Sequence, residues 1–515
     1  MLARLNAAAV FGVEALPVSV EVDVSGGGLP GVTMVGLPDA TVRESRDRVR
    51  SAIRNSGFPF PAGRVTVSLA PADVRKVGAA FDLPIALGIL AASGLLPQRD
   101  GRDMTIVGGL SLDGGIPAMQ GVLPIAVAAR NTARPALLFP SANLAEAGIV
   151  KDLPLFPVGS LLDAVRVLSL SEPEPATAPY PKSQTAISDG GAAAEDLADV
   201  CGQLLGRRAL EIAAAGAHHL LFSGPPGAGK TMLARRLAGL LPPLDFDEAL
   251  VVTSVHSIAG LLTAGAGLVT TRPFRAPHHT CSDMALVGGG AIPRPGEISL
   301  AHGGVLFLDE LPEFSRRVLE TLRQPLESGV VHVARVSRTT TFPARVMLVG
   351  AMNPCPCGFH GDARRPCHCP PTLVDRYQRR LSGPLRDRFD LGVEVQAVPW
   401  SEMSESEPRE ATAAVRARVE AARALQMARQ AQLNGLLDGR ALRRTARLAA
   451  EGQSLLGKAV TRMGLSVRGV SRVLRVARTI ADLQGVSEVQ TAHVAEALQF
   501  RVPERGGAPH SSFEA

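Results

Sequence analysis

The chain has 515 residues, of which 46% are hydrophobic and 20% are charged, as in an ordinary globular protein. This length and composition exclude a single small module, a coiled coil and a disordered tail, and they predict about three domains. Lysine and arginine (54) outnumber aspartate and glutamate (48), and the formal net charge of +6 permits a polyanionic partner. Only 4% of the residues are aromatic, which disfavours aromatic platforms for stacking nucleic acid bases.

The first third of the chain alternates short strand and helix patterns. Alternating hydrophobicity at 18–24, 64–69 and 104–108 predicts β-strands, and the pattern at 40–55 predicts a helix. Because the apolar start of the chain runs into strand 18–24, we interpret it as part of a folded domain and not as a signal peptide. We therefore expect an α/β domain over residues 1–170.

A change of composition separates this domain from the rest. Residues 171–194 are rich in Pro, Ser, Thr, Gly and Ala and have almost nothing to bury, which is typical of a linker. Within 195–398, buried strand patterns alternate with helices, and this predicts a parallel sheet covered on both faces. We expect its strands to include 220–223, 305–308 and 345–351.

Only helical patterns remain near the C-terminus. We expect an all-helical domain over 399–502, followed by a flexible tail at 503–515. The helices are predicted at 410–433, 439–456, 466–483 and 491–501. The longest apolar stretch of the chain, 81–96, is shorter than the about 20 apolar residues that a membrane span needs, so we expect no membrane partner and a cytoplasmic location.

A phosphate-binding motif opens the second domain. Residues 224–231 match GxxxxGK[ST] and lie between a predicted strand and a predicted helix. Glycines let backbone N–H groups approach phosphates at a helix N-terminus, while Lys230 reaches the β- and γ-phosphate oxygens and Thr231 offers its hydroxyl to Mg²⁺. The predicted site for ATP and Mg²⁺ is therefore Gly224, Pro225, Pro226, Gly227, Ala228, Gly229, Lys230 and Thr231.

Two later strands end in polar residues. Strand 305–308 runs into Asp309, a candidate Mg²⁺ ligand, and Glu310, a candidate for orienting and polarising the attacking water. Strand 345–351 leads to Asn353, whose amide is a candidate sensor of the γ-phosphate. A turn or helix-capping role for this Asn-Pro pair is the alternative interpretation.

Arginines gather at the junction of the second and third domains. Segment 376–390 contains several guanidinium groups, and we expect one of them to stabilise the phosphoryl charge in a neighbouring subunit. Arg468 opens a predicted helix of the third domain and is a candidate for reaching the nucleotide. A solvated basic face or a salt-bridge network is the alternative.

Cysteines cluster in residues 355–369, directly after the candidate sensor. The cluster consists of two CxC pairs: Cys355, Cys357, Cys367 and Cys369. Four thiolates on one loop can bind Zn²⁺ tetrahedrally, although the spacing differs from that of common zinc fingers, and His360 and His368 are substitute ligands. Free thiols or a redox pair are the alternatives. Arg364 and Arg365 lie within the loop and are candidate DNA contacts.

These elements, in this order, resemble an AAA+ ATPase, and three longer phrases are more specific. They are Ala276-Pro-His-His279, Pro295-Gly-Glu-Ile-Ser-Leu-Ala-His-Gly-Gly304-Val-Leu-Phe-Leu-Asp-Glu310 and Leu381-Ser-Gly-Pro-Leu-Arg-Asp-Arg-Phe-Asp390. The phrases look like those of the magnesium-chelatase-like YifB family, which includes competence proteins of the ComM type. The resemblance covers essentially the whole chain.

The resemblance implies roles for several of these residues. It makes Asn353 the residue known as sensor 1, Arg388 the arginine finger that acts in trans, and Arg468 sensor 2. Arg386 is the competitor for the finger role. The family usually assembles as a nucleotide-dependent hexameric ring, and its ComM members resemble DNA branch-migration motors.

The resemblance also implies a pore-facing hairpin at 330–342. Arg335 and Arg338 within this segment are candidate contacts to the DNA backbone, a mode of binding that is electrostatic and independent of base sequence. An ordinary solvated hairpin is the alternative.

The first domain resembles a degenerate Lon protease C-terminal domain, which has a ribosomal S5 domain 2-like fold. The matching positions hold Ala80 in place of the nucleophilic serine and Pro124 in place of the lysine base. A Ser-Lys mechanism needs both groups, so we do not expect proteolysis. A role in assembly or partner binding is the expectation.

The expected fold is thus α/β, with a Lon-protease-like domain, an AAA+ P-loop core built on a parallel sheet and an all-helical lid. The expected function is that of an ATP-hydrolysing ring motor on single-stranded or branched DNA, as a helicase or branch-migration factor in recombination or natural transformation, with recombination proteins as partners. One alternative is a chelatase-type subunit that remodels a partner protein. A nucleotide switch without motor activity is another.

Overall fold

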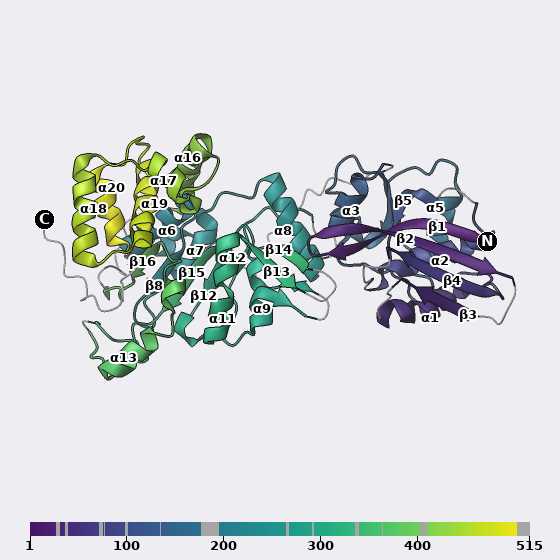
Figure 1. Ribbon diagram of the computed structural model, residues 1–515, viewed down its shortest axis with the longest axis horizontal. Coiled ribbons are helices and arrows are strands. Elements are labelled where there is room, and N and C mark those ends of the chain that lie inside the picture. Colours follow the sequence, from purple (N-terminus) through teal and green to yellow (C-terminus); the bar gives the residue numbers. More distant parts are fainter. Residues whose placement is uncertain are drawn as a thin grey trace.

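The computed structural model describes residues 1–26, 31–36, 40–71, 76, 78–97, 101–133, 135–176, 195–263, 267–290, 293–334, 339–362, 364–400, 402 and 409–501. The molecule is elongated, with the N-terminal unit at one end and the C-terminal helices at the other (Figure 1). Of the expected linker at 171–194, only 171–176 belong to the described residues, and the expected tail at 503–515 lies outside them.

The N-terminal unit is built on a seven-stranded mixed sheet with the order β3-β4-β2-β1-β5-β6-β7. Its strands are β1 (Leu2–Phe11), β2 (Glu14–Ser25), β3 (Gly31–Val35), β4 (Arg64–Ala70), β5 (Gly101–Ile106), β6 (Leu137–Pro140) and β7 (Leu155–Val158). Its helices are α1 (Ala40–Asn55), α2 (Asp82–Ala92), α3 (Val122–Arg130), α4 (Leu144–Ala147) and α5 (Leu161–Ser169).

Hydrophobic alternation explains how the strands of this sheet face the core. In β2, the side chains of Val18, Val20 and Val22 are buried on one face, as the period of two requires. Helix α2 is buried almost all round, because it packs on β1 and β2 and is covered in turn by α1. A helix that is apolar on all sides needs such a fully enclosed position.

The central unit contains a five-stranded sheet with the order β16-β8-β15-β12-β9, in which all neighbouring strands are parallel. Its strands are β8 (Leu220–Ser223), β9 (Phe274–Arg275), β12 (Val305–Leu308), β15 (Met347–Met352) and β16 (Leu391–Glu394). Strands β12 and β15 are buried along their whole length, as expected for a parallel sheet covered by helices on both faces.

Helices and two short ribbons complete the central unit. The helices are α6 (Leu204–Gly216), α7 (Lys230–Leu240), α8 (Phe246–Ala259), α9 (Asp283–Val287), α10 (Glu297–Leu300), α11 (Arg316–Thr321), α12 (Arg323–Ser328), α13 (Pro371–Gln378) and α14 (Gly383–Arg386). The antiparallel ribbons pair β10 (Gly288–Gly289) with β11 (Arg294–Pro295) and β13 (Val330–Ala334) with β14 (Thr339–Pro343).

The C-terminal region is helical, and this confirms the expected α/β fold with an all-helical end. Its helices are α16 (Thr412–Gln430), α17 (Gly439–Thr445), α18 (Ala450–Met463), α19 (Val467–Leu483) and α20 (Thr491–Gln499). One hydrophobic cluster joins these helices to α6, α7 and the sheet, so the region shares a core with the central unit. Among the described residues, no helix is both long and apolar enough to cross a membrane.

The expectation of one continuous helix over 439–456 is wrong. The chain leaves the helical conformation at Ala446, which has φ −112° and ψ 52°, and a new helix begins at Ala450. Between the two helices, Leu448 forms a parallel β-bridge with Val489. This tertiary pairing overrides a segment whose residues all tolerate a helix.

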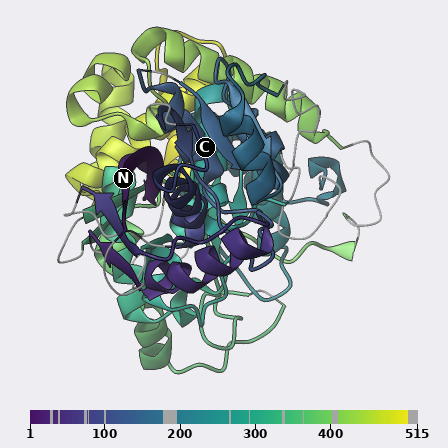
Figure 2. The same ribbon diagram turned by 90° about the vertical axis from the view of Figure 1, so that its right-hand side faces the viewer.

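The N-terminal unit is attached to the central unit through α3 and α8. The backbone N–H of Gly121 donates to the hydroxyl oxygen of Ser257 at 3.0 Å, and the same hydroxyl donates to the buried carboxylate of Glu146. Figure 2 shows the molecule with the N-terminal unit toward the viewer and the other two regions behind it. These hydrogen bonds attach the segments around Gly121 and Glu146 of the N-terminal unit to α8.

Candidate nucleotide-binding site

The predicted phosphate-binding loop joins β8 to the N-terminus of α7. Gly227 and Gly229 have φ values of 75° and 93°, which side-chain-bearing residues adopt only with strain. Gly224 packs against the backbone carbonyl of Val395 and leaves no space for a Cβ. The glycines therefore permit the tight turn that brings the loop backbone to the N-terminus of a helix, where anions are bound favourably.

Lys230 lies at the centre of this loop and is buried. Its Nζ donates to the carbonyl oxygens of Gly224 and Pro225 at 2.7 and 2.8 Å and to Oδ1 of Asn353 at 3.0 Å. Burial lowers the pKa of Lys230, and the charges of Asp309 and Glu310 oppose this shift. The ammonium group is thus held by neutral oxygens that phosphate oxygens can replace, so the site fits a nucleotide.

The candidate magnesium ligands are in direct contact. Thr231 donates its hydroxyl to Oδ2 of Asp309 at 2.6 Å, and Oδ1 of the same carboxylate accepts the backbone N–H of Glu310 at 2.9 Å. Mg²⁺ prefers oxygen ligands and usually binds through one or two protein groups plus phosphates and waters. The hydroxyl and carboxylate fit such a site.

Glu310 contacts a residue to which sequence reasoning assigns no role. Its Oε2 lies 3.1 Å from Nδ1 of His279, and the Glu310 side chain is 57% exposed. His279 follows β9, which pairs in parallel with β12, so both residues extend from the same edge of the sheet. This contact could be predicted only from the order of the strands, which places β9 beside β12. Strand β9 has two residues, too few to show a hydrophobic periodicity in the sequence.

Arg388 lies near the amino ends of the parallel strands, whereas the phosphate-binding loop lies at their carboxyl ends. It precedes β16, whose first residue, Leu391, pairs in parallel with Leu220, the first residue of β8. Its guanidinium pairs with Glu327 of α12, and its buried Nε has no hydrogen-bond partner within the described part of the chain. Burial lowers the pKa of Arg388, and the positive charge of Arg468 adds to this shift.

The other two candidate arginines differ in their surroundings. Arg468, at the start of α19, is 72% exposed and lies 4.0 Å from the carboxylate of Asp387, beside Arg388. Arg386 donates to the carbonyl oxygen of Gln378 at 3.3 Å. The structure therefore groups Arg388 and Arg468 at the amino ends of the strands. Lys230, the Thr231–Asp309 pair and Asn353 meet at the carboxyl ends.

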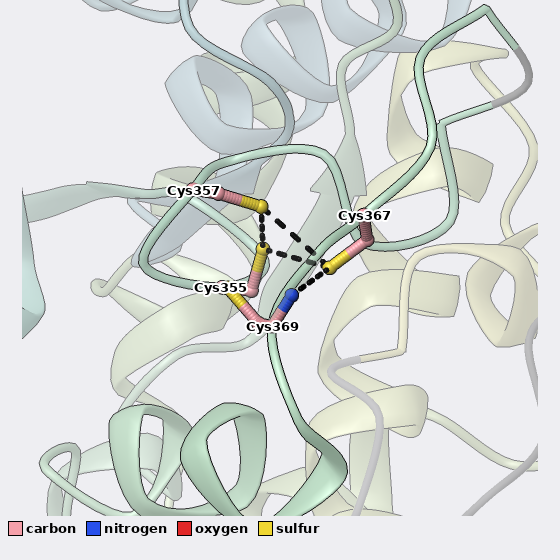
Figure 3. A group of neighbouring side chains, drawn as sticks. All are labelled: Cys355, Cys357, Cys367 and Cys369. Atoms are coloured by element: carbon pink, nitrogen blue, oxygen red, sulfur yellow. Dashed lines mark hydrogen bonds between the residues drawn. The ribbon is translucent and has the colours of Figure 1, made fainter.

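The two CxC pairs come together in one cluster (Figure 3). Their sulfurs all lie within 4.8 Å of one another, and His360 and His368 are not part of the group. A backbone hydrogen bond from Phe359 and the neighbouring thiol of Cys355 lower the pKa of Cys357 to about 6. The sulfurs of Cys355 and Cys357 are 3.3 Å apart, too far for a disulfide, so the thiols are free.

The remaining candidate contacts for DNA are only partly described. The expected hairpin at 330–342 corresponds to β13 and β14, which pair antiparallel, but Arg335 and Arg338 lie outside the described residues. Arg364 and Arg365 are exposed, and their backbone N–H groups donate to Oδ1 of Asp362 at 2.6 and 3.1 Å.

The strand order and the polar residues at the strand ends define the class of protein. An AAA+ nucleotide-binding core has these parts: a glycine-rich loop, a Thr-Asp pair, a following glutamate, an asparagine directly after the intervening strand, and a helical C-terminal region.

Comparisons with known proteins identify the family within this class. The family described as magnesium chelatase, subunit ChlI, matches residues 196–403, subunit ChlI of Mg-chelatase matches 20–143, and the ChlI C-terminal family matches 409–501. The chain is 46% identical to competence protein ComM of Haemophilus influenzae, over 97% of each chain. It is 44% identical to YifB of Salmonella typhimurium, over 98% of each chain.

A more distant relative is the magnesium-chelatase 38 kDa subunit of Rhodobacter capsulatus, which is 26% identical over 53% of this chain and 77% of its own. The full-length matches confirm the resemblance inferred from the motifs. The chain belongs to the ComM and YifB family of magnesium-chelatase-like proteins.

Proposed function

We propose that the protein hydrolyses ATP. The observation that carries this proposal is the convergence of Lys230, the Thr231–Asp309 pair and Asn353 at the carboxyl ends of three neighbouring parallel strands. Bound Mg²⁺ would be held by Thr231 and Asp309, and it would neutralise charge on the phosphates. The chain's own residues supply the remaining functions.

Lys230 exchanges its carbonyl partners for phosphate oxygens, and the charges of two carboxylates oppose the lowering of its pKa by burial. Asn353, which contacts the same ammonium group, reports the presence of the terminal phosphate by the loss of that contact. Glu310 orients the attacking water and accepts its proton. His279 holds the carboxylate of Glu310 at the sheet edge and thereby fixes its direction.

We propose that a neighbouring subunit completes the site. Arg388 lies at the amino ends of the parallel strands, so it contacts a phosphate bound to the next chain. Arg468, on the same surface, contacts that phosphate too. Each subunit then has the nucleotide-binding residues on one face and the two arginines on another. Such a head-to-tail interface closes into a ring when the rotation permits, and a hexamer is the expected state.

We propose DNA as the substrate of the motor. The formal charge of +6, the exposed Arg364 and Arg365 in the loop that follows Asn353, and the ribbon β13–β14 support contacts to a phosphate backbone. The name of the Haemophilus relative, a competence protein, supports a role in natural transformation. A branch-migration or helicase activity on single-stranded or branched DNA is the form that we expect, in the cytoplasm and with recombination proteins as partners.

A second candidate function is the remodelling of a partner protein, as in a chelatase. The similarity to the magnesium-chelatase 38 kDa subunit favours it, because the match extends beyond the phosphate-binding loop. Proteolysis is not proposed, since Ala80 and Pro124 supply neither a nucleophile nor an amine base.

A strand-separation assay distinguishes the two candidates. Wild-type protein with ATP and Mg²⁺ should separate a labelled four-way junction or forked duplex, and Glu310→Gln, which keeps the binding residues, should not. Active hydrolysis with no strand separation on any branched DNA would contradict the DNA proposal and favour a protein substrate.

A further inference from the structure

We propose that Cys355, Cys357, Cys367 and Cys369 bind one structural Zn²⁺, and that this metal holds the loop between Asn353 and α13 against the phosphate-binding loop. The first half of the proposal stands on the cysteine cluster alone. The second half rests on the proposed nucleotide site, which the loop contacts.

The spacing of the sulfurs matches a tetrahedral metal site. With Zn–S bonds of about 2.3 Å, the sulfurs of a tetrahedral site lie about 3.8 Å apart. The sulfur of Cys355 lies 3.3 Å from that of Cys357 and 3.7 Å from that of Cys367, and the latter two are 3.6 Å apart. All four sulfurs, that of Cys369 included, fit within one coordination sphere.

A backbone hydrogen bond to sulfur provides an independent observation. The N–H of Cys369 donates to the sulfur of Cys367 at 3.4 Å. A backbone N–H that donates to a thiolate ligand orients it and stabilises its negative charge.

Charge and burial also favour a bound dication. As each Zn–S bond forms, the thiol releases its proton to solvent, so four thiolates and Zn²⁺ leave a net charge of about −2. Arg364 and Arg365 lie within the same loop and bring two positive charges to it. Cys355 is fully buried, where an uncompensated thiolate would be costly. A set of four thiolates selects zinc or iron among the common metals, and zinc fits a site with no redox function.

The loop contacts the phosphate-binding loop at Gly358, and it contacts α13 at its own first residue, Pro354. Gly358, between the two CxC pairs, packs so closely on Pro226 of the phosphate-binding loop that a Cβ at residue 358 would lie 2.5 Å from the Cδ of Pro226. The carbonyl oxygen of Pro354, next to Asn353, accepts the side-chain amide of Gln378 at 3.1 Å. A metal that fixes this loop therefore supports the phosphate-binding loop from outside.

Metal analysis tests the first half. Freshly purified full-length protein should contain about one zinc per chain, and the double variant Cys355→Ser/Cys369→Ser should contain none, while Cys201→Ser, which alters a cysteine outside the cluster, should retain it. Replacement with Co²⁺ should give the intense visible bands of a tetrahedral tetrathiolate. Absence of metal, or iron in place of zinc, would overturn the assignment.

Nucleotide binding tests the second half. If removal of zinc by a chelator leaves the phosphate-binding loop correctly supported for about one-tenth of the time, the apparent Kd for a fluorescent ATP analogue rises about tenfold and returns on addition of Zn²⁺. An unchanged Kd in the metal-free protein would refute the coupling. A wild-type protein that contains zinc but binds no nucleotide would instead refute the proposed function and leave the metal site intact.

Discussion

The position of Arg388 gives the sharpest prediction. Strand β16 has four residues and therefore carries the chain about 13 Å along the sheet, from the edge near Arg388 to the edge that holds the phosphate-binding loop. An extended arginine side chain reaches only about 7 Å from its Cα. Arg388 therefore cannot contact the phosphate bound by its own chain. If it is an arginine finger, Arg388→Ala should lower ATP turnover by about 10³- to 10⁵-fold, and only through a neighbouring subunit.

A mixing experiment measures this directly. Arg388→Ala retains its own Glu310, and Glu310→Gln retains its own Arg388, so each variant alone should be inactive. In a randomly mixed ring at equal amounts, about one quarter of the interfaces join an intact Glu310 to an intact Arg388, and turnover should recover to about one quarter of the wild-type rate. The exposed, surface-paired Arg379 provides the matched control, because Arg379→Ala should stay fully active.

Two results would refute the reasoning. If the mixture stays inactive while mixed rings are shown to form, the two residues do not act at one interface. If Arg388→Ala hydrolyses ATP normally and Arg386→Ala does not, the finger is Arg386. Nucleotide binding by each variant confirms that the fold is retained.

Four further predictions follow from the site and the packing. Lys230→Ala should raise the Kd for ATP by about 10- to 100-fold, because it removes charge-assisted hydrogen bonds to phosphate, and titration with a fluorescent analogue measures this. Glu310→Gln should bind ATP normally but turn it over about 10²- to 10⁴-fold more slowly in single-turnover assays, and normal turnover would remove Glu310 from its role. His279→Ala should lower kcat and leave ATP affinity unchanged, since its ion-pair partner is the carboxylate that orients the water and its ring otherwise packs on His278 and Phe314; an equal loss of affinity would contradict this positioning role. Burial lowers the pKa of His302 from 6.5 to about 4, so the unfolded chain takes up the proton first as the pH falls, and the free energy of unfolding should drop by about 3 kcal/mol between pH 6.5 and pH 4. His302→Asn, which can still accept the N–H of Arg345, should show a smaller drop in denaturant titrations.

Contiguous features could be predicted from the sequence. The glycine-rich loop occupies eight consecutive residues, 224–231, and its flanking strand and helix have the expected patterns. Asp309 and Asn353 directly follow buried strands, so their place at the sheet edge follows from chain direction alone. The structure brings both of them to the loop, at Thr231 and Lys230 respectively.

Features that depend on tertiary packing could not be predicted. The contact between His279 and Glu310 requires the strand order, which places the two-residue β9 beside β12. The CxC spacing suggests the ligands of a metal, but nothing in it places Gly358 on Pro226. The break in the predicted helix at 439–456 likewise comes from a β-bridge to a distant residue and not from the local sequence.

In the proposed function, ATP hydrolysis at this site drives work on DNA. The test is steady-state ATPase activity measured with and without single-stranded, duplex and four-way-junction DNA, at two salt concentrations and with Glu310→Gln as the blank. We predict strong stimulation that is largest on branched or single-stranded DNA and that weakens as salt rises, because phosphate contacts release counterions. Robust hydrolysis that is indifferent to every DNA at both salt concentrations would contradict the claim.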